Sequence, residues 1–284
     1  MSLFVPGLGQ VYNGQLKKAI FYLLAFIPIL FLFGLTGVLD HFLGFFILAL
    51  ALVIYRILVS IEALRTSKKL GEYELKPVNQ NWIYLVFALS ANIVLWYGTQ
   101  LSREVSGYET FSVPSQSMEP SIQVGDRIMA TRLNPMNIEL GDVVTFTRED
   151  GQKYLCRVVG LPNQEIQIID DKVVINKDIE EWSKTRTSWD KNFEYQEYQS
   201  KLSTGRAYHI KKILKFNGAD SPFFEFSNKE PIKVPANHFY VVGDNRNNSL
   251  DSRYYGTIPS EDIKNKVAYI WWSFDTKRIG MRFE

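Results

Sequence analysis

Residues 143–159 read VVTFTREDGQKYLCRVV, and this stretch predicts two strands joined by a tight turn. Val143–Arg148 and Lys153–Val159 are rich in β-branched and aromatic residues, and an Asp-Gly pair lies in the polar run Glu149–Gln152 between them. Asp-Gly between two runs of this kind is a strong signal for a β-hairpin. The stretch therefore favours an antiparallel β-domain.

Short apolar runs separated by turn residues continue on both sides of this hairpin. We expect further strands at Arg127–Leu133, Glu165–Ile169, Lys172–Ile175, His238–Val242 and Lys266–Ser273. Asp170-Asp171 marks a second hairpin, and no amphipathic helix of convincing length is apparent after residue 102. These features predict a mainly β domain of folded sheets or a barrel over residues 102–284. Residues from about 180 to 230 are more polar and less regular, and we interpret them as an inserted lobe.

The first 101 residues have a different composition. They carry 7 Lys/Arg and 4 Asp/Glu, whereas the remaining residues carry 25 and 26. Three stretches, 19–38, 42–61 and 82–101, are almost free of charge, and about 20 apolar residues are needed to cross a bilayer. We therefore predict three transmembrane α-helices in a membrane domain, residues 1–101. Core helices of a soluble protein are the alternative, but the rest of the chain offers little to cover them.

Positive charge near the spans predicts the orientation of the chain. It is concentrated before the first span and in the loop 62–81, at Lys17, Lys18, Arg65, Lys68, Lys69 and Lys76. The loop around Asp40 and His41 has no Lys or Arg, so we expect it outside and the 62–81 loop in the cytoplasm. The β-domain then lies on the outer side of a multi-pass protein of the cytoplasmic (inner) membrane. The run Pro6–Gly14 resembles the Gly-Gln-x-Tyr-x-Gly entry of small two-helix membrane modules, and a flexible re-entrant or interfacial turn is the alternative; we assign it no chemistry.

Composition also limits the classes of partner. The near-zero net charge of residues 102–284 argues against nucleic acid, which requires a basic face. Cys156 is the only cysteine, so no intrachain disulfide forms, and the three histidines are too far apart for a common metal motif. We expect no metal and no cofactor.

Two polar segments are candidates for chemistry. Residues 111–122 read FSVPSQSMEPSI, with Ser115 and Ser117 on either side of Gln116, and residues 243–256 read GDNRNNSLDSRYYG. Taken alone, the first could be a turn rich in serine and the second a loop rich in Asn and Asp that hydrogen-bonds its own backbone.

Together the two segments resemble bacterial signal peptidase I, a family of serine peptidases with a Ser/Lys dyad. Residues 111–122 resemble its nucleophile box, and residues 243–256 its last box. Gly141–Phe146 and Arg157–Pro162 are similar to the two boxes between them, in the same order along the chain. The resemblance implies a signal-peptidase-like fold and a membrane-bound endopeptidase that removes signal peptides from exported preproteins. Its partners are then signal peptides and the lipid bilayer.

The resemblance also implies roles for individual residues. By position, Ser117 is the nucleophile, and the Ser115 hydroxyl and the Ser117 N–H form the oxyanion hole. Ser249 and Asp251 orient the base and support the scaffold. Tyr154 and Leu155 help to line a cleft in which the substrate lies as an added strand.

At one position the sequence departs from the family. The lysine that deprotonates the serine is replaced by Cys156. A buried thiol is a poor base because burial raises its pKa. Lys153 is the nearest amine in sequence, but strand alternation turns it to the face opposite Cys156, so we expect it to substitute only through a bulge.

Three hypotheses remain open at this point. The chain is an active signal peptidase with an atypical base, or a catalytically silent relative that binds signal peptides or assists secretion. The third hypothesis is an unrelated membrane-anchored β-module. That hypothesis requires Ser115, Ser117 and Ser249 to lie far apart.

Overall fold

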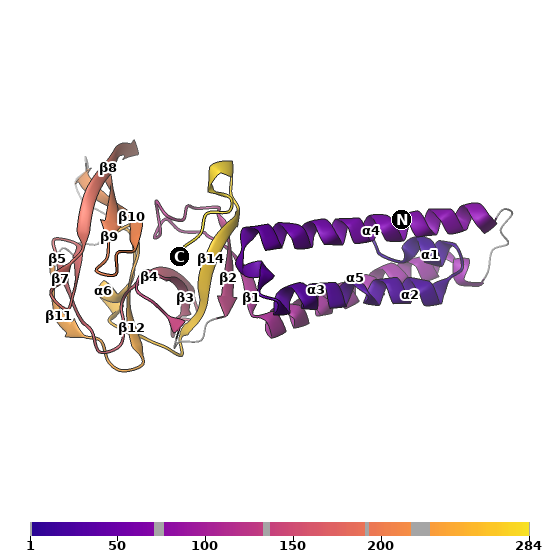
Figure 1. Ribbon diagram of the computed structural model, residues 1–284, viewed down its shortest axis with the longest axis horizontal. Coiled ribbons are helices and arrows are strands. Elements are labelled where there is room, and N and C mark those ends of the chain that lie inside the picture. Colours follow the sequence, from indigo (N-terminus) through magenta and orange to yellow (C-terminus); the bar gives the residue numbers. More distant parts are fainter. Residues whose placement is uncertain (1, 71–76, 133–136, 191–192, 217–227, 284) are drawn as a thin grey trace. The chain divides into compact units, whose positions relative to one another are not determined.

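The computed structural model describes residues 2–70, 77–132, 137–190, 193–216 and 228–283. The chain divides into two compact units, Met1–Tyr108 and Glu109–Glu284. The first is helical and the second is built mainly of antiparallel sheet (Figure 1). The sequence placed the boundary after residue 101, whereas the last helix of the first unit continues to Ser106. Gly107 ends that helix in a left-handed conformation, with φ of 75°.

The helical unit contains three segments that are long and apolar enough to cross a membrane, Leu16–Leu35, Phe42–Leu70 and Asn81–Ser106. Its helices are α1 (Leu8–Tyr12), α2 (Leu16–Leu24), α3 (Phe26–Leu35), η1 (Val38–Asp40), α4 (Phe42–Leu70), η2 (Pro77–Asn79) and α5 (Asn81–Ser106). α4 extends into the predicted loop 62–81, because residues 62–70 include good helix formers and two lysines in the last turn. Lys76 of that loop lies outside the described residues.

The run Pro6–Gly14 is a packed structure rather than a flexible turn. Gln10 is fully buried in α1, and its Nε2 donates to Val59 O at 2.9 Å and to Glu62 Oε2 at 2.8 Å. Asn13 Nδ2 donates to Ala63 O at 2.7 Å. Amides shielded from water need partners of this kind, so α1 is fixed to α4 by hydrogen bonds.

The second unit contains three sheets. The seven-stranded sheet has the order β1 (Tyr108–Ser112), β2 (Arg127–Arg132), β14 (Ile263–Trp272), β3 (Val143–Thr147), β4 (Lys153–Gly160), β12 (His238–Val242) and β13 (Ile258–Pro259). The four-stranded sheet has the order β11 (Asn228–Lys233), β5 (Glu165–Ile169), β6 (Lys172–Ile175) and β7 (Asp178–Ile179). The three-stranded sheet has the order β10 (Ala207–Phe216), β9 (Phe193–Lys201) and β8 (Glu181–Asp190). The described part of this unit also contains the short helices α6 (Ser252–Tyr255) and η4 (Thr276–Arg278).

The predicted hairpins are present. β3 pairs with β4 without a bulge, from Val143 opposite Arg157 to Thr147 opposite Lys153. β5 and β6 are joined at Asp170 and Asp171, whose φ values of 50° and 65° suit a two-residue turn of the I′ type. β5, β6 and β12 have the predicted bounds. β2 ends at Arg132, and Leu133 lies outside the described residues.

The region from 180 to 230 is more regular than the sequence indicated. Within its described residues, β8, β9 and β10 form an antiparallel sheet with long, nearly continuous registers. Tyr195, Tyr208 and Ile210 are buried, while many of their neighbours are charged or amide side chains. A sheet with one solvated face has this mixed composition, which concealed its strands in the sequence. Residues 191–192 and 217–227 lie outside the described part.

Candidate active site

One cavity of about 380 Å³ gathers most of the predicted site residues. It lies between the nucleophile segment (residues 111–122), the first half of β4 and the last loop (residues 243–251). The predicted residues that line it are Ser115, Ser117, Tyr154, Leu155, Cys156 and Ser249. Segments more than a hundred residues apart in sequence therefore meet at one site. This contradicts the expectation of the unrelated-module hypothesis.

The two serines of the nucleophile segment face each other. Ser115 Oγ lies 3.2 Å from Ser117 Oγ, and this is the one hydrogen bond of the Ser117 hydroxyl within the described residues. The neighbouring Met118 and Ile122 are fully buried in an apolar cluster. Anchoring of these side chains holds the Ser117 hydroxyl at the cavity surface, where a substrate can reach it.

The last loop is hydrogen-bonded to the main chain of the nucleophile segment. Asn245 N donates to Ser117 O at 3.0 Å, and Asn245 Nδ2 donates to Gln116 O at 3.1 Å. Gly243 lies between Ser249 and the Ser117 main chain: a Cβ added there would be 2.2 Å from Ser249 Oγ and 2.7 Å from Ser117 O. Neither Gly243 nor Asn245 was predicted for the site, although both belong to the recognised last box.

Asp251 does not line the cavity. Its carboxylate is fully buried, accepts from Gly243 N at 2.8 Å and forms a bidentate pair with Arg253, at 2.9 and 2.8 Å. Ser252 Oγ accepts from Val241 N at 2.9 Å. Asp251 therefore connects the end of β12 to α6 and acts on the loop's shape, not on substrate.

Consecutive residues of β4, Tyr154 and Leu155, both line the cavity although they point to opposite faces of the strand. Tyr154 stacks on Phe146 with ring centroids 5.5 Å apart, and its hydroxyl donates to Asp150 Oδ2 at 2.8 Å, which raises the pKa of Tyr154 to about 12. Leu155 packs on the opposite side, against the cluster that contains Met118. Both residues thus present apolar surface beside the serines.

Cys156 is 1% exposed and packs within an apolar cluster that includes Val144 and Val158. Burial raises the pKa of its thiol well above the usual value, and the Asp251 carboxylate raises it further. The Ser249 hydroxyl and the Arg253 guanidinium favour the thiolate but do not offset these effects. At neutral pH Cys156 is therefore a thiol and is not a base.

The Ser249 hydroxyl beside it is also buried, and it forms no hydrogen bond of good geometry within the described residues, although it lies close enough to the Cys156 sulfur to favour the thiolate. A buried hydroxyl without a partner is unfavourable. The resemblance implies that Ser249 orients a lysine amine, and no amine lies beside this hydroxyl in the described hydrogen bonds.

Lys153 lines the cavity although β4 contains no bulge at this point. The cavity also includes Phe111 and Ser112 of β1 and so reaches Lys153 at the start of β4; that Lys153 replaces the family lysine only through a bulge or register shift stays a prediction. Lys153 Nζ lies 3.6 Å from Glu109 Oε2 and 4.8 Å from the centre of the Phe111 ring. The side chain is 54% exposed. Lys153 is the one amine lining the cavity within the described residues.

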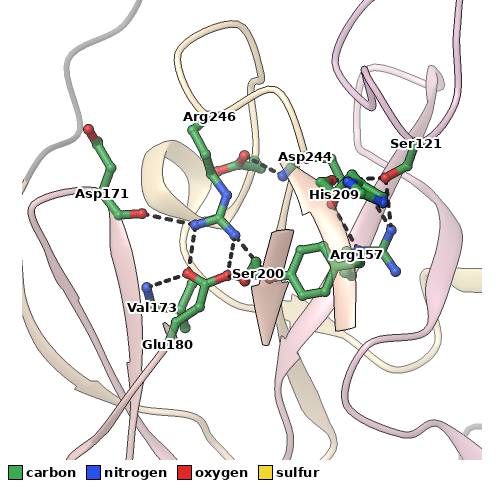
Figure 2. Close-up of polar contacts among 12 residues, drawn as sticks. Ser121, Arg157, Asp171, Val173, Glu180, Ser200, His209, Asp244 and Arg246 are labelled. Carbon is green, nitrogen blue, oxygen red and sulfur yellow. Dashed lines mark hydrogen bonds and ion pairs between the residues drawn. The ribbon is translucent and has the colours of Figure 1, made fainter. Parts of the chain in front are cut away.

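Figure 2 shows a network of charged side chains that includes Asp244 and Arg246 of the last loop. Arg157 donates to both carboxylate oxygens of Asp244, and its guanidinium lies 4.2 Å from the Tyr208 ring centre. Arg246 donates to both oxygens of Glu180, at 2.7 and 3.0 Å. No local pattern in the sequence indicates Glu180 or Tyr208, because their partners are distant along the chain.

The Glu180 carboxyl is stabilised in its charged form. Burial alone would raise its pKa, but the Arg246 guanidinium and hydrogen bonds from Arg246, Ser200 and Tyr208 outweigh burial and lower that pKa to about 2. All four side chains are buried. The network pairs the two buried charges and joins β10 and the segment before β8 to the last loop, although Arg246 Nε has no hydrogen-bond partner within the described residues.

Comparison with known proteins is consistent with this geometry. The family "Signal peptidase, peptidase S26" matches residues 81–272. Signal peptidase I of Buchnera aphidicola is 31% identical over 220 residues, which cover 60% of this chain and 70% of the relative. The probable signal peptidase I-2 of Synechocystis is 26% identical and covers 76% and 82% of the two chains.

A crystal structure of a signal peptidase I from Enterococcus faecalis is 21% identical, with a TM-score of 0.27, and the match covers 45% of this chain and 93% of that chain. The assignment rests on the family match, which spans more than half of the chain and overturns the hypothesis of an unrelated module. The chain belongs to the signal peptidase family, peptidase S26, a family of serine endopeptidases.

Proposed function

We propose that Ser117 is the nucleophile of this signal peptidase and that Ser115 supplies an oxyanion-hole donor. Ser117 Oγ attacks the scissile carbonyl, and the bond between this carbon and the leaving amine breaks after a tetrahedral intermediate. The Ser115 hydroxyl and the Ser117 N–H donate to the oxyanion, where one donor contributes about 3–4 kcal/mol. The observation that carries this proposal is the 3.2 Å separation of the two hydroxyls on one cavity.

The substrates are signal peptides of exported preproteins. The cavity beside Ser117 has apolar walls from Val113, Ile128, Tyr154 and Leu155, which suit short aliphatic side chains before the cleaved bond. A peptide bound as an added strand presents alternate side chains to these walls.

Lys153 acts as the general base that deprotonates Ser117 Oγ. A lysine amine accepts a proton only when it is neutral, so this role requires Lys153 to be deprotonated in the substrate complex. Its ion pair with Glu109, between side chains 54% and 36% exposed, is loose and of a kind that contributes about 0–1 kcal/mol. The side chain can therefore leave Glu109 at little cost. The proton moves from Ser117 Oγ to Lys153 Nζ and then to the leaving amine.

The β-unit acts on the outer side of the cytoplasmic membrane. This orientation is supported by the positive residues before the first span and after the second, with none around Asp40. Fusions of a reporter that is active only outside the membrane test it. We expect signal from fusions after Asp40 and at the C-terminus, and none after Leu70. The reverse pattern would refute the orientation.

Cleavage assays test the chemistry. The full chain in detergent is incubated with a preprotein whose signal peptide ends in Ala-x-Ala. We expect cleavage by the wild type, none by Ser117→Ala and a loss of at least about a hundredfold in Lys153→Met. Met keeps the length and apolar character of the lysine stem, so it isolates the amine.

The silent relative is the second candidate function, and the buried thiol of Cys156 is the observation in its favour. Cys156→Lys distinguishes the two, because it places an amine next to the buried Ser249 hydroxyl. Cleavage by Cys156→Lys alone, with wild type and Lys153→Met equally inactive, would support a silent binding protein. Equal activity of wild type and Lys153→Met would instead remove Lys153 from the mechanism.

A further inference from the structure

The three-stranded sheet reaches the nucleophile segment through β10. Lys211 Nζ on this strand lies 2.9 Å from Glu119 Oε2, and Glu119 is two residues after Ser117. The two side chains are 15% and 17% exposed, so solvent screens their interaction only in part. The ring of Tyr195 on β9 lies 4.0 Å from the same Nζ and holds the ammonium from the other side.

The main chain of Lys211 is bound to the last loop as well. Its N–H donates to Asp244 O at 2.9 Å, and its carbonyl accepts from Arg246 N at 2.9 Å. Two residues before Lys211, His209 O accepts from Ser121 Oγ at 2.9 Å (Figure 2). β10 therefore contacts both the nucleophile segment and the loop that carries Ser249.

We propose that Lys211 is a positioning residue that fixes the nucleophile segment through Glu119. The predicted inserted lobe is then part of the catalytic apparatus and not an accessory module. Without the ammonium, the half-shielded Glu119 carboxylate loses its counter-charge and turns toward water. The turn around Gln116 and Ser117 shifts with it, and a shift of about 1 Å at a reacting group is sufficient to lower catalysis by two orders of magnitude.

The chain contains a matched control. Lys215 lies on the same strand and pairs with Glu194 at 3.9 Å, but its side chain is 72% exposed. The variants to compare are Lys211→Met, Lys211→Arg, Glu119→Gln and Lys215→Met, each in the full chain in detergent. Lys211→Arg keeps the charge and serves as the rescue variant. None of these residues lines the cavity.

The activity measurement rests on the proposed function. We expect Lys211→Met and Glu119→Gln to lower kcat by about tenfold to a hundredfold with KM changed less than about twofold. Lys211→Arg recovers most of kcat, and Lys215→Met equals the wild type. A merely structural role would lower the fraction of folded enzyme and would not be rescued by arginine. A rise in KM alone, or equal losses in Lys211→Met and Lys215→Met, would overturn the proposal.

Hydrogen exchange provides a readout that does not require activity. The amides of Glu119 and Ile122 donate to Gln116 O at 3.1 Å and to Met118 O at 2.9 Å. We expect both to exchange at least about tenfold faster in Lys211→Met and Glu119→Gln, and not in Lys215→Met. If no variant cleaves but this pattern is found, the positioning role stands and the proposed function fails. Unchanged exchange in Lys211→Met would overturn the positioning role, whatever the activity.

Discussion

Arg157 and Asp244 form a buried bidentate ion pair, with Nε–Oδ1 at 2.8 Å and Nη2–Oδ2 at 2.6 Å. Arg157 follows Cys156 on β4, and Asp244 follows Gly243 in the last loop. The exposed fractions of the two residues are 3% and 1%. The pair therefore joins the wall of the cavity to the loop that supports the nucleophile, in a place where water does not weaken it.

We predict that Asp244→Asn and Arg157→Met each destabilise the β-unit by about 3–5 kcal/mol. Asp244→Asn leaves the buried Arg157 guanidinium without its counter-charge, and Arg157→Met does the same to the buried Asp244 carboxylate. Thermal unfolding of the full chain in detergent measures this. The double variant Arg157→Met/Asp244→Leu is expected to lose less than the sum of the single losses. Additive losses would mean that the two side chains do not interact.

The Ser115 hydroxyl is expected to stabilise the transition state by donating a hydrogen bond to the oxyanion. Ser115→Ala removes the donor 3.2 Å from Ser117 Oγ, and we expect kcat to fall by about 10²- to 10³-fold with little change in KM. Ser112→Ala is the matched control, since Ser112 also lines the cavity but has no such contact. If both variants kept wild-type kcat, Ser115 would not belong to the oxyanion hole.

Gly243 is expected to tolerate no side chain. In Gly243→Ala the new methyl group overlaps Ser249 Oγ and the Ser117 carbonyl, so the nucleophile segment and the last loop must move apart. We expect loss of cleavage and a Tm lowered by several degrees. Gly151→Ala is the control: its Cβ meets nothing within 4 Å, so it costs only the strain of a positive φ, of order 1 kcal/mol. Equal effects of the two changes would contradict the packing argument.

The sequence predicted the strands best where short apolar runs end at clear turn residues. β5 alternates between buried and more exposed residues, whereas β6 and β12 are almost continuously buried, and all three have the predicted bounds. The sheet β8–β10 was missed because Gln, Glu and Lys fill its solvated face. The helices α4 and α5 continue beyond the C-terminal ends of the second and third predicted spans, whereas the first apolar segment ends at Leu35, before residue 38.

The site could be predicted only in part. Ser115, Ser117 and Ser249 carry a recognisable motif, and the structure brings them to one cavity. Glu180 and Lys211 have no local pattern, because their partners Arg246 and Glu119 are 66 and 92 residues away. The position of Lys153 depends on where the cavity opens along β4, and alternation alone does not contain that information.

Cys156 is expected to be unreactive in the folded protein. Its thiol is buried and its pKa is raised, so the thiolate that attacks alkylating reagents is scarce at neutral pH. We expect modification by iodoacetamide at pH 7.5 to be at least about a hundredfold slower than in denaturant. Mass spectrometry measures it without ambiguity, because the chain has one cysteine. Rapid native modification would show that the cavity exposes the thiol and would reopen its role in catalysis.

Glu180 predicts a pH dependence of stability. Its pKa is lowered from the usual value of 4.5 to about 2 in the folded state. A carboxyl with a lowered pKa stabilises the fold above its unfolded pKa, and this contribution is lost as the pH falls from about 4.5 to about 2. Glu180→Gln lacks the titrating group, so the difference in Tm between wild type and variant is expected to shrink over this window.

Glu230→Gln, on the exposed strand β11, is the control for this titration. Its Tm is expected to follow the wild type at every pH, because Glu230 is exposed to water in the folded chain. At neutral pH Glu180→Gln is less stable than the wild type by several kcal/mol, since Arg246 is buried and loses its counter-charge. If the difference in Tm between wild type and Glu180→Gln stayed constant from pH 5 to pH 2, Glu180 would have the same pKa in the folded and unfolded chains. The network around Arg246 would then not lower the pKa of Glu180.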